Sequence, residues 1–149
     1  MRTIEITTVV DAPADAVWAV LAEHARYPEW NPFVRRLEGE LTEGSRLTVE
    51  IAPPGGRPMT FRPTVTVVEP GRRLQWLGRL GVPGIFDGRH TFELTPLPDG
   101  RTELRHSETF SGLLVPLTGK TLARTAEGFA AMNAAVADRV ATRRDAAAG

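Results

Sequence analysis

A chain of 149 residues is long enough for one sizeable hydrophobic core and too short for two. Its 18 Lys and Arg residues equal its 18 Asp and Glu residues, so no net charge draws the protein to nucleic acid or to anionic lipid. Stable insertion into a membrane is not expected either. It has no cysteine, which excludes a disulfide framework and a thiolate zinc site.

We expect a single domain over residues 1–149, because no repeat, low-complexity block or linker divides the chain. No apolar run approaches the ~20 residues that span a bilayer. The N-terminal residues are typical of a strand rather than of a signal peptide. The expectation is therefore a cytoplasmic protein, with monomer and dimer both left open.

The N-terminal part predicts a strand followed by helical turns. Thr3–Val10 is rich in β-branched residues and begins by alternating. A helix should follow, with Asp11 in its cap region, Pro13 in its first turn and apolar residues at helical spacing. Two prolines then limit a second, very short helix around residues 29–31.

A series of strands is predicted next. Their expected ranges are Val34–Leu41, Arg46–Ala52, Pro58–Val68, Arg73–Leu80, Asp87–Leu97 and Arg101–Ser111. The connecting segments contain Gly, Pro, Asp and Glu in patterns typical of turns. Consecutive strands joined by short turns pair in antiparallel fashion.

The apolar period changes to that of a helix from Leu117 to about Arg143. The residues on one face are Leu122, Ala126, Phe129, Asn133, Val136 and Val140, with Met132 beside them. A long helix with one apolar stripe needs a sheet to pack on. The predicted fold class is therefore α+β, with a curved antiparallel sheet wrapped around the C-terminal helix.

Three stretches carry a resemblance to a known family. They are TTVVDAPADAVWAVLAEHARYPEWNPFV, VVEPGRRLQW and HTFELTPLPDGRTELRHSETFSGLL. Together with the terminal helix they resemble the START-like (SRPBCC) superfamily, which includes Bet v 1-like plant allergens and polyketide cyclases. The resemblance covers nearly the whole chain, and it specifies the fold better than the activity because its motifs mostly encode turns and core.

The resemblance implies a helix-grip fold, in which a curved seven-stranded antiparallel sheet surrounds a long C-terminal helix. It also implies two short helices after the first strand and an apolar cavity between the sheet and the long helix. Family members bind lipids, sterols, polyketides or other small hydrophobic molecules. Some are cyclases or dehydratases, and others are carriers or partners of other proteins.

The turn Leu97–Arg101 fixes which side chains of the last two strands face the helix. Its proline suits the first central position and its glycine the left-handed position, so the two ends of the turn lie opposite each other. Counting outward, the predicted pairs are Leu94 with Leu104, Phe92 with His106 and His90 with Glu108. A slip by one residue would turn a charged face to the core, so this parity is strongly specified.

The inward-facing surface is expected to be mostly apolar and to bind the ligand. Its expected members are Trp30, Met59, Phe61, Trp76, Phe86, His90, Phe92, His106, Glu108, Phe110, Phe129, Met132 and Asn133. Trp30 and Phe33 could close the mouth of the cavity. The segment Leu77–Gly88 is predicted to be an apolar turn at the entrance, and Phe110–Gly119 is predicted to be either a flexible entry into the helix or a lid.

Two histidines and Glu108 invite two interpretations. In the structural one, His90 and Glu108 form a satisfied cross-strand pair, and His106 binds backbone or water. In the functional one, all three are catalytic or ligand-binding residues that hold a hydroxyl or carbonyl group, or move a proton during cyclisation or dehydration. A carboxylate alone in an apolar pocket is costly, so Glu108 should be either paired with a histidine or protonated.

Two histidines and a glutamate have donor atoms that suit a metal. Their positions follow from strand alternation, and no diagnostic ligand doublet is present, so neither a metal nor another cofactor is expected. The expected function is binding of a small hydrophobic ligand in an internal cavity. The alternatives are a polyketide cyclase or dehydratase and a partner-binding module with a filled core.

Overall fold

The computed structural model describes residues 1–79 and 81–148. Its helices and strands follow the order expected from the sequence. They are β1 (Arg2–Val10), α1 (Ala14–Ala22), η1 (His24–Arg26), α2 (Tyr27–Trp30), β2 (Val34–Glu38), β3 (Thr48–Ile51), β4 (Met59–Phe61), β5 (Thr64–Glu69), β6 (Arg73–Arg79), β7 (Asp87–Pro96), β8 (Thr102–Ser111), η2 (Val115–Leu117) and α3 (Gly119–Ala148).

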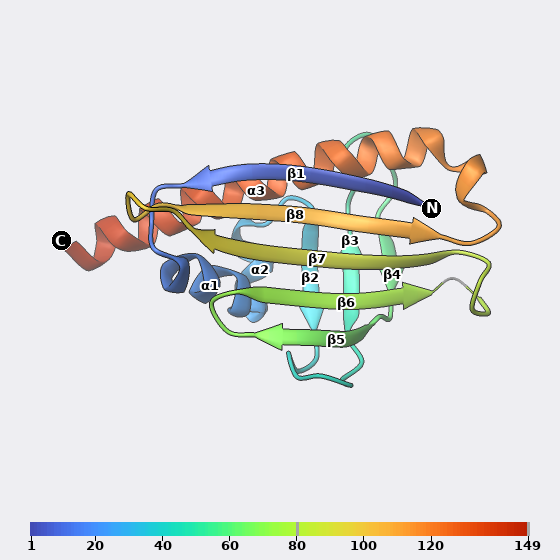
Figure 1. Cartoon of the computed structure of the whole chain (residues 1–149), viewed down its shortest axis with the longest axis horizontal. Coiled ribbons are helices and arrows are strands. Elements are labelled where there is room, and N and C mark those ends of the chain that lie inside the picture. Colours follow the sequence, from blue (N-terminus) through green and yellow to red (C-terminus); the bar gives the residue numbers. More distant parts are fainter. Residues whose placement is uncertain (80, 149) are drawn as a thin grey trace.

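The strands form two antiparallel sheets. Five pair in the order β1-β8-β7-β6-β5 and three in the order β2-β3-β4. β4 and β5 occupy the range predicted for one strand, which is interrupted beside Pro63 because proline has no N–H for the ladder. Counted as one bent strand they complete the seven expected, and the sheets surround α3 (Figure 1). The α+β class and the helix-grip arrangement are confirmed.

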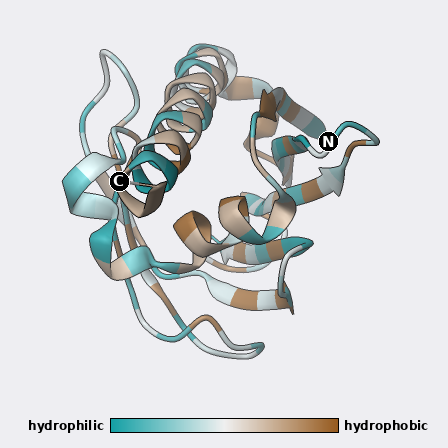
Figure 2. Ribbon diagram, turned by 90° about the vertical axis from the view of Figure 1, so that its left-hand side faces the viewer, coloured by the Kyte–Doolittle hydropathy of each residue, from teal (hydrophilic) through white to brown (hydrophobic). Residues whose placement is uncertain are grey.

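One face of α3 packs against the strands. Its buried residues recur at helical spacing and are Leu122, Thr125, Gly128, Phe129, Met132, Asn133, Val136 and Val140. Hydrophilic and hydrophobic bands alternate along the helix when it is viewed from its C-terminal end (Figure 2). None of the helices in the described ranges, α3 included, is long and apolar enough to cross a bilayer.

The C-terminal helix runs five residues further than predicted. Its last turns are held by two arginines: Arg143 pairs with Glu23, and Arg144 Nη1 donates to the backbone oxygen of Asp11 at 2.9 Å. Asp11 therefore contacts α3 through its carbonyl. α1 begins one residue later than expected, since Pro13 is its N-cap residue rather than part of its first turn, and no side chain caps it.

The hairpin register matches the prediction, with one exception at a bulge. His90 lies opposite Glu108, and the other two predicted pairs of β7 and β8 are also found. In β5, the turn at residues 69–72 favours Val67 opposite Leu74, but a shift after Val65 places Val68 there instead. Leu80, the last residue of one predicted strand, lies outside the described residues.

Gly128 lets the ring of Phe33 lie directly against α3. A Cβ at this position would overlap that ring. The ring is buried and meets Phe129 edge to face, with centroids 5.5 Å apart. Glycine costs about 1 kcal/mol in a helix interior relative to alanine, so this close approach offsets the lower helix propensity.

We therefore expect Gly128→Ala to lower the free energy of unfolding by about 1–3 kcal/mol, since the packed ring must shift. Urea denaturation measures this change. Gly119→Ala is the matched control, because its Cβ would approach nothing closer than 3.9 Å. A stabilised Gly128→Ala protein, as helix propensity alone would give, would contradict the packing argument.

Candidate functional site

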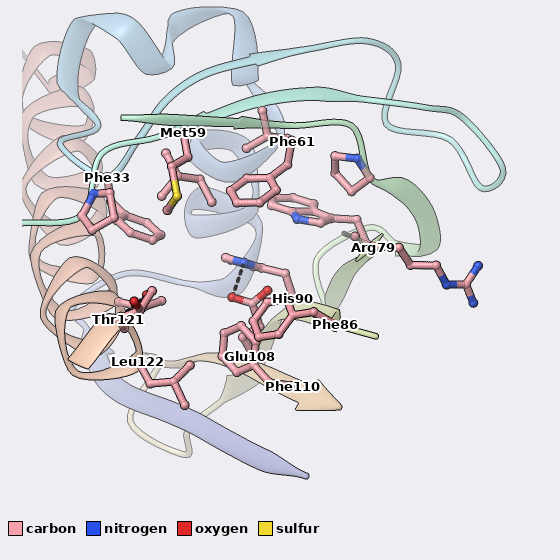
Figure 3. A pocket seen from close by; sticks show the side chains of 18 residues that line it. Phe33, Met59, Phe61, Arg79, Phe86, His90, Glu108, Phe110, Thr121 and Leu122 are labelled. Carbon is pink, nitrogen blue, oxygen red and sulfur yellow. Dashed lines mark hydrogen bonds and ion pairs between the residues drawn. The ribbon is translucent and has the colours of Figure 1, made fainter. Parts of the chain in front are cut away.

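A pocket lies between the two sheets and the N-terminal half of α3 (Figure 3). Its volume is about 100 Å³. The residues that line it are Phe33, Val49, Ile51, Pro53, Met59, Phe61, Pro63, Trp76, Gly78, Arg79, Phe86, Gly88, His90, Glu108, Phe110, Thr121, Leu122 and Thr125. Most of this surface is apolar, and His90 and Glu108 are its polar end on β7 and β8.

Seven of the residues expected to contact a ligand line this pocket. They are Met59, Phe61, Trp76, Phe86, His90, Glu108 and Phe110. The other six are not lining residues: Phe92, His106, Phe129, Met132 and Asn133 are buried in the core, and Trp30 packs edge to face on Tyr27 at 5.3 Å. Strand alternation gives the face of a side chain but not its depth along the sheet.

Two glycines that the sequence analysis did not select are also part of the pocket. Gly78 of β6 lies directly opposite Gly88 of β7, and both line the cavity. The missing side chain at Gly78 leaves open space, where a Cβ would have no neighbour closer than 3.8 Å. The sequence feature that could have indicated them is the presence of one glycine in each of two adjacent predicted strands.

Four polar side chains form a chain from the pocket to α3. Glu108 Oε1 lies 3.7 Å from His90 Nδ1, and His90 Nε2 lies 2.7 Å from His106 Nε2. His106 Nδ1 lies 3.0 Å from Asn133 Oδ1. The exposed fraction of the Glu108 side chain is 16 %, whereas that of His90 is 1 %. The carboxyl group is thus the accessible end of the chain.

The hydrogen-bond partners determine the protons on this chain. Asn133 Nδ2 donates to the carbonyl of Ile6 and to Thr8 Oγ1, so Asn133 Oδ1 accepts from His106 Nδ1. A neutral His106 then has a bare Nε2, which accepts a hydrogen bond from the Nε2–H group of His90. His106 is therefore bound to two side chains, in place of the backbone or water of the structural interpretation.

His90 Nδ1 remains, as a buried atom without a hydrogen-bond partner among the described residues. Its distance of 3.7 Å from Glu108 is too long for a direct hydrogen bond. Within the described part of the chain, His90 Nδ1 is therefore left without a direct partner, beside the carboxyl group of Glu108.

Aromatic rings enclose both imidazoles. His106 stacks on Phe129 with ring centroids 3.8 Å apart, and His90 stacks on Trp76 at 4.7 Å. Burial lowers the pKa of His106 well below its usual value, and the neighbouring His90 lowers it further, against the opposing hydrogen bond to Asn133. His106 is consequently neutral, as the hydrogen-bond pattern requires.

Gly88 provides the space for the Glu108 carboxyl group. A Cβ at position 88 would lie 2.6 Å from Glu108 Oε2. A larger residue there would push the carboxyl group away from its present position beside His90. Within residues 1–79 and 81–148, no group of three or more His, Asp or Glu side chains is arranged to hold a metal ion.

A family model described as polyketide cyclase / dehydrase and lipid transport matches residues 1–143. No curated protein matches the chain. Among solved structures, the ZhuI aromatase/cyclase from Streptomyces sp. R1128 is 23 % identical with a TM-score of 0.78, covering 99 % of this chain and 98 % of that chain.

Two further solved structures are similar over their full length. Protein MLL2253 from Mesorhizobium loti is 22 % identical with a TM-score of 0.73, covering 95 % of this chain and 98 % of that one. A norcoclaurine synthase point mutant from Thalictrum flavum, bound to a transition-state analogue, is 19 % identical with a TM-score of 0.68 and 96 % coverage of each chain. At these identities the likeness shows a shared fold.

The buried His106 predicts a pH dependence of stability. Its folded pKa lies below the unfolded value of 6.5, so only the unfolded chain takes up this proton as the pH falls below 6.5. The contribution of neutral His106 to the free energy of unfolding is therefore complete above pH 6.5. Below that pH it is lost, and the free energy of unfolding falls by up to about 1.4 kcal/mol per pH unit. Urea denaturation between about pH 7.5 and about pH 5 measures the slope.

His106→Gln should reduce this slope, because the group that titrates is gone. His24→Gln, which removes a histidine elsewhere in the chain, is the control. Because His106 is still present in this variant, it should retain the part of the slope that comes from His106. Equal slopes for His106→Gln and the parent protein would show that His106 is not buried in its neutral form.

Proposed function

The chain belongs to the polyketide cyclase / dehydrase and lipid transport family, and from this membership and the pocket we propose that it binds a small, uncharged hydrophobic molecule. The observation that carries the proposal is a mostly apolar pocket with two polar side chains, His90 and Glu108, at its end. A ring would lie among Phe61, Trp76 and Phe110. A hydroxyl or carbonyl oxygen would meet Glu108 and the unpartnered Nδ1 of His90.

The size of the pocket limits the ligand. An apolar cavity of about 150 Å³ binds benzene, and this pocket measures about 100 Å³. A single ring therefore requires a small adjustment, and a larger ligand must extend through the mouth. Met59 is exposed at the rim and Phe86 is half-buried there. Methionine is flexible, so its movement could widen the opening.

The polarity of the lining also limits the ligand. Most of the surface is apolar, and the one cation among the described lining residues, Arg79, is already paired with Asp87. An anionic ligand would lose its hydration without gaining a free counter-ion there. A neutral hydroxyl or carbonyl compound, such as an aromatic metabolite or a polyketide, fits these properties.

Filling the pocket should abolish binding. Gly78→Leu adds a side chain into the cavity, and a Cβ at this position meets only ordinary contacts, the nearest at 3.8 Å. We expect at least a roughly tenfold loss of affinity, corresponding to about 1.4 kcal/mol. Quenching of tryptophan fluorescence by a panel of one- to three-ring phenols and ketones measures it.

Arg89→Leu is the matched control for that experiment. It adds the same side chain to the exposed opposite face of β7, and its affinity should equal that of the parent protein. If no compound of the panel quenches the parent protein, or if Gly78→Leu binds as well as Arg89→Leu, the pocket is not the binding site.

An enzymatic role is the second candidate, and the unpartnered Nδ1 of His90 favours it. With Glu108 ionised, the carboxylate could take a proton from the carbon next to a ketone while His90 Nδ1–H hydrogen-bonds the carbonyl oxygen. Return of that proton to the oxygen gives the enol and restores the pair. Cyclisations and dehydrations of polyketides begin with such enols. The pocket disfavours the third alternative, a partner-binding module with a filled core.

Glu108→Gln separates the two roles, since it keeps the shape of the side chain and removes the base. If the pocket is catalytic, exchange of the α-hydrogens of a bound bicyclic ketone with D2O, followed by NMR, should slow by about 100-fold or more. Affinity for the same ketone should change little. Exchange no faster with the parent protein than in buffer would leave binding as the sole role.

A further inference from the structure

Two loops beside the pocket form a protruding apolar surface, which we call the tip and define by residues 81–86 and 112–119. Neither segment contains a charged side chain. Three of its side chains are largely exposed: Val82 at 63 %, Leu113 at 78 % and Leu117 at 81 %. Both segments lie at the end of the molecule that holds the start of β1 (Figure 1).

The tip is a defined structure and not a pair of independent loops. Leu113 N donates to the carbonyl of Gly84 at 3.1 Å, and Leu114 N donates to that of Ile85 at 3.0 Å. Beneath them Val115 is buried against Phe110 and Leu122. Residues 112–119 thus bury Val115 while Leu113 and Leu117 face solvent. A small core is present beneath these exposed side chains.

Cations stand at the base of the tip. Lys120 directly follows it and is exposed, and Arg2 Nη1 lies 3.9 Å from where a Cβ of Gly119 would be. Neither cation forms an ion pair with the part of the chain that the structure describes. Arg79 extends away from the pocket (Figure 3) and is balanced by Asp87, with its Nε 3.6 Å from Asp87 Oδ1.

We propose that the tip docks on the surface of an anionic phospholipid membrane. Val82, Leu113 and Leu117 would lie below the headgroups, and Arg2 and Lys120 would face the lipid phosphates. Protruding apolar side chains backed by cations are the combination that binds the membrane interface. A stable protein interface needs roughly 20–30 residues a side. The exposed apolar side chains of the tip number six, which are Val82, Pro83, Leu113, Leu114, Pro116 and Leu117.

Docking in this orientation would also serve the pocket. Phe86 of the tip and Phe110 beside it line the cavity, so the membrane would lie next to its opening. A hydrophobic ligand could then exchange with the bilayer over a short path. This last consequence rests on the proposed function, whereas membrane docking itself does not.

The test is co-sedimentation of the full chain with phosphatidylcholine vesicles, with and without about 30 % phosphatidylserine. Leu113→Ser and Leu117→Ser should each weaken binding to the anionic vesicles about tenfold. Lys120→Gln should weaken it about fivefold, and about 0.5 M salt should have a similar effect. Val9→Ser is the matched control, since Val9 is 45 % exposed at the other end of β1.

Binding that needs phosphatidylserine and is lost in the serine variants but kept in Val9→Ser would support the proposal. Absence of binding to anionic vesicles would overturn it, as would equal binding by all variants. Self-association that the serine substitutions abolish, without vesicle binding, would assign the tip to contact between copies and would also overturn it. Vesicle binding is measured without ligand, so its failure is distinct from failure of the pocket to bind.

Discussion

The hydrogen bond between His106 and Asn133 is the interaction on which the interior of this protein depends. It joins β8 to α3, and the same asparagine also donates to two groups of β1. The position and rotation of the long helix are thus tied to two adjacent strands. Because the amide presents its oxygen to the imidazole, it also fixes the tautomer of His106, and through His106 the proton on His90 Nε2. One polar contact in an apolar core therefore orders both the packing and the chemistry.

Periodicity and turn chemistry were enough to predict the α+β class and the inward-facing residues of β7 and β8, and the resemblance supplied the helix-grip arrangement. The parity of β7 and β8 follows from one turn and from the cost of burying their charged face, both of which are local. The partner of His106 was not predictable in this way, because Asn133 lies 27 residues away on a helix whose rotation depends on the whole core. The same holds for Phe92 and Met132, which face inward as expected but lie deeper than the pocket.

Glycine has three separate structural roles around the pocket. Gly78 omits a side chain and leaves open space in the cavity. Gly88 provides room for the Glu108 carboxyl group, and Gly128 admits the ring of Phe33 to the helix surface. The net charge of the chain, which is zero, does not show how charged side chains are distributed on its surface. The tip has no charged side chain, and two cations lie at its base.

The orientation of the buried hydrogen bonds has a consequence for a proton at the pocket. The row of polar side chains from Glu108 to α3 ends at the amide oxygen of Asn133, which accepts a hydrogen bond and cannot pass a proton onward. These four side chains therefore offer no path through the core, and a proton on the Glu108 carboxyl group exchanges with water by way of the pocket.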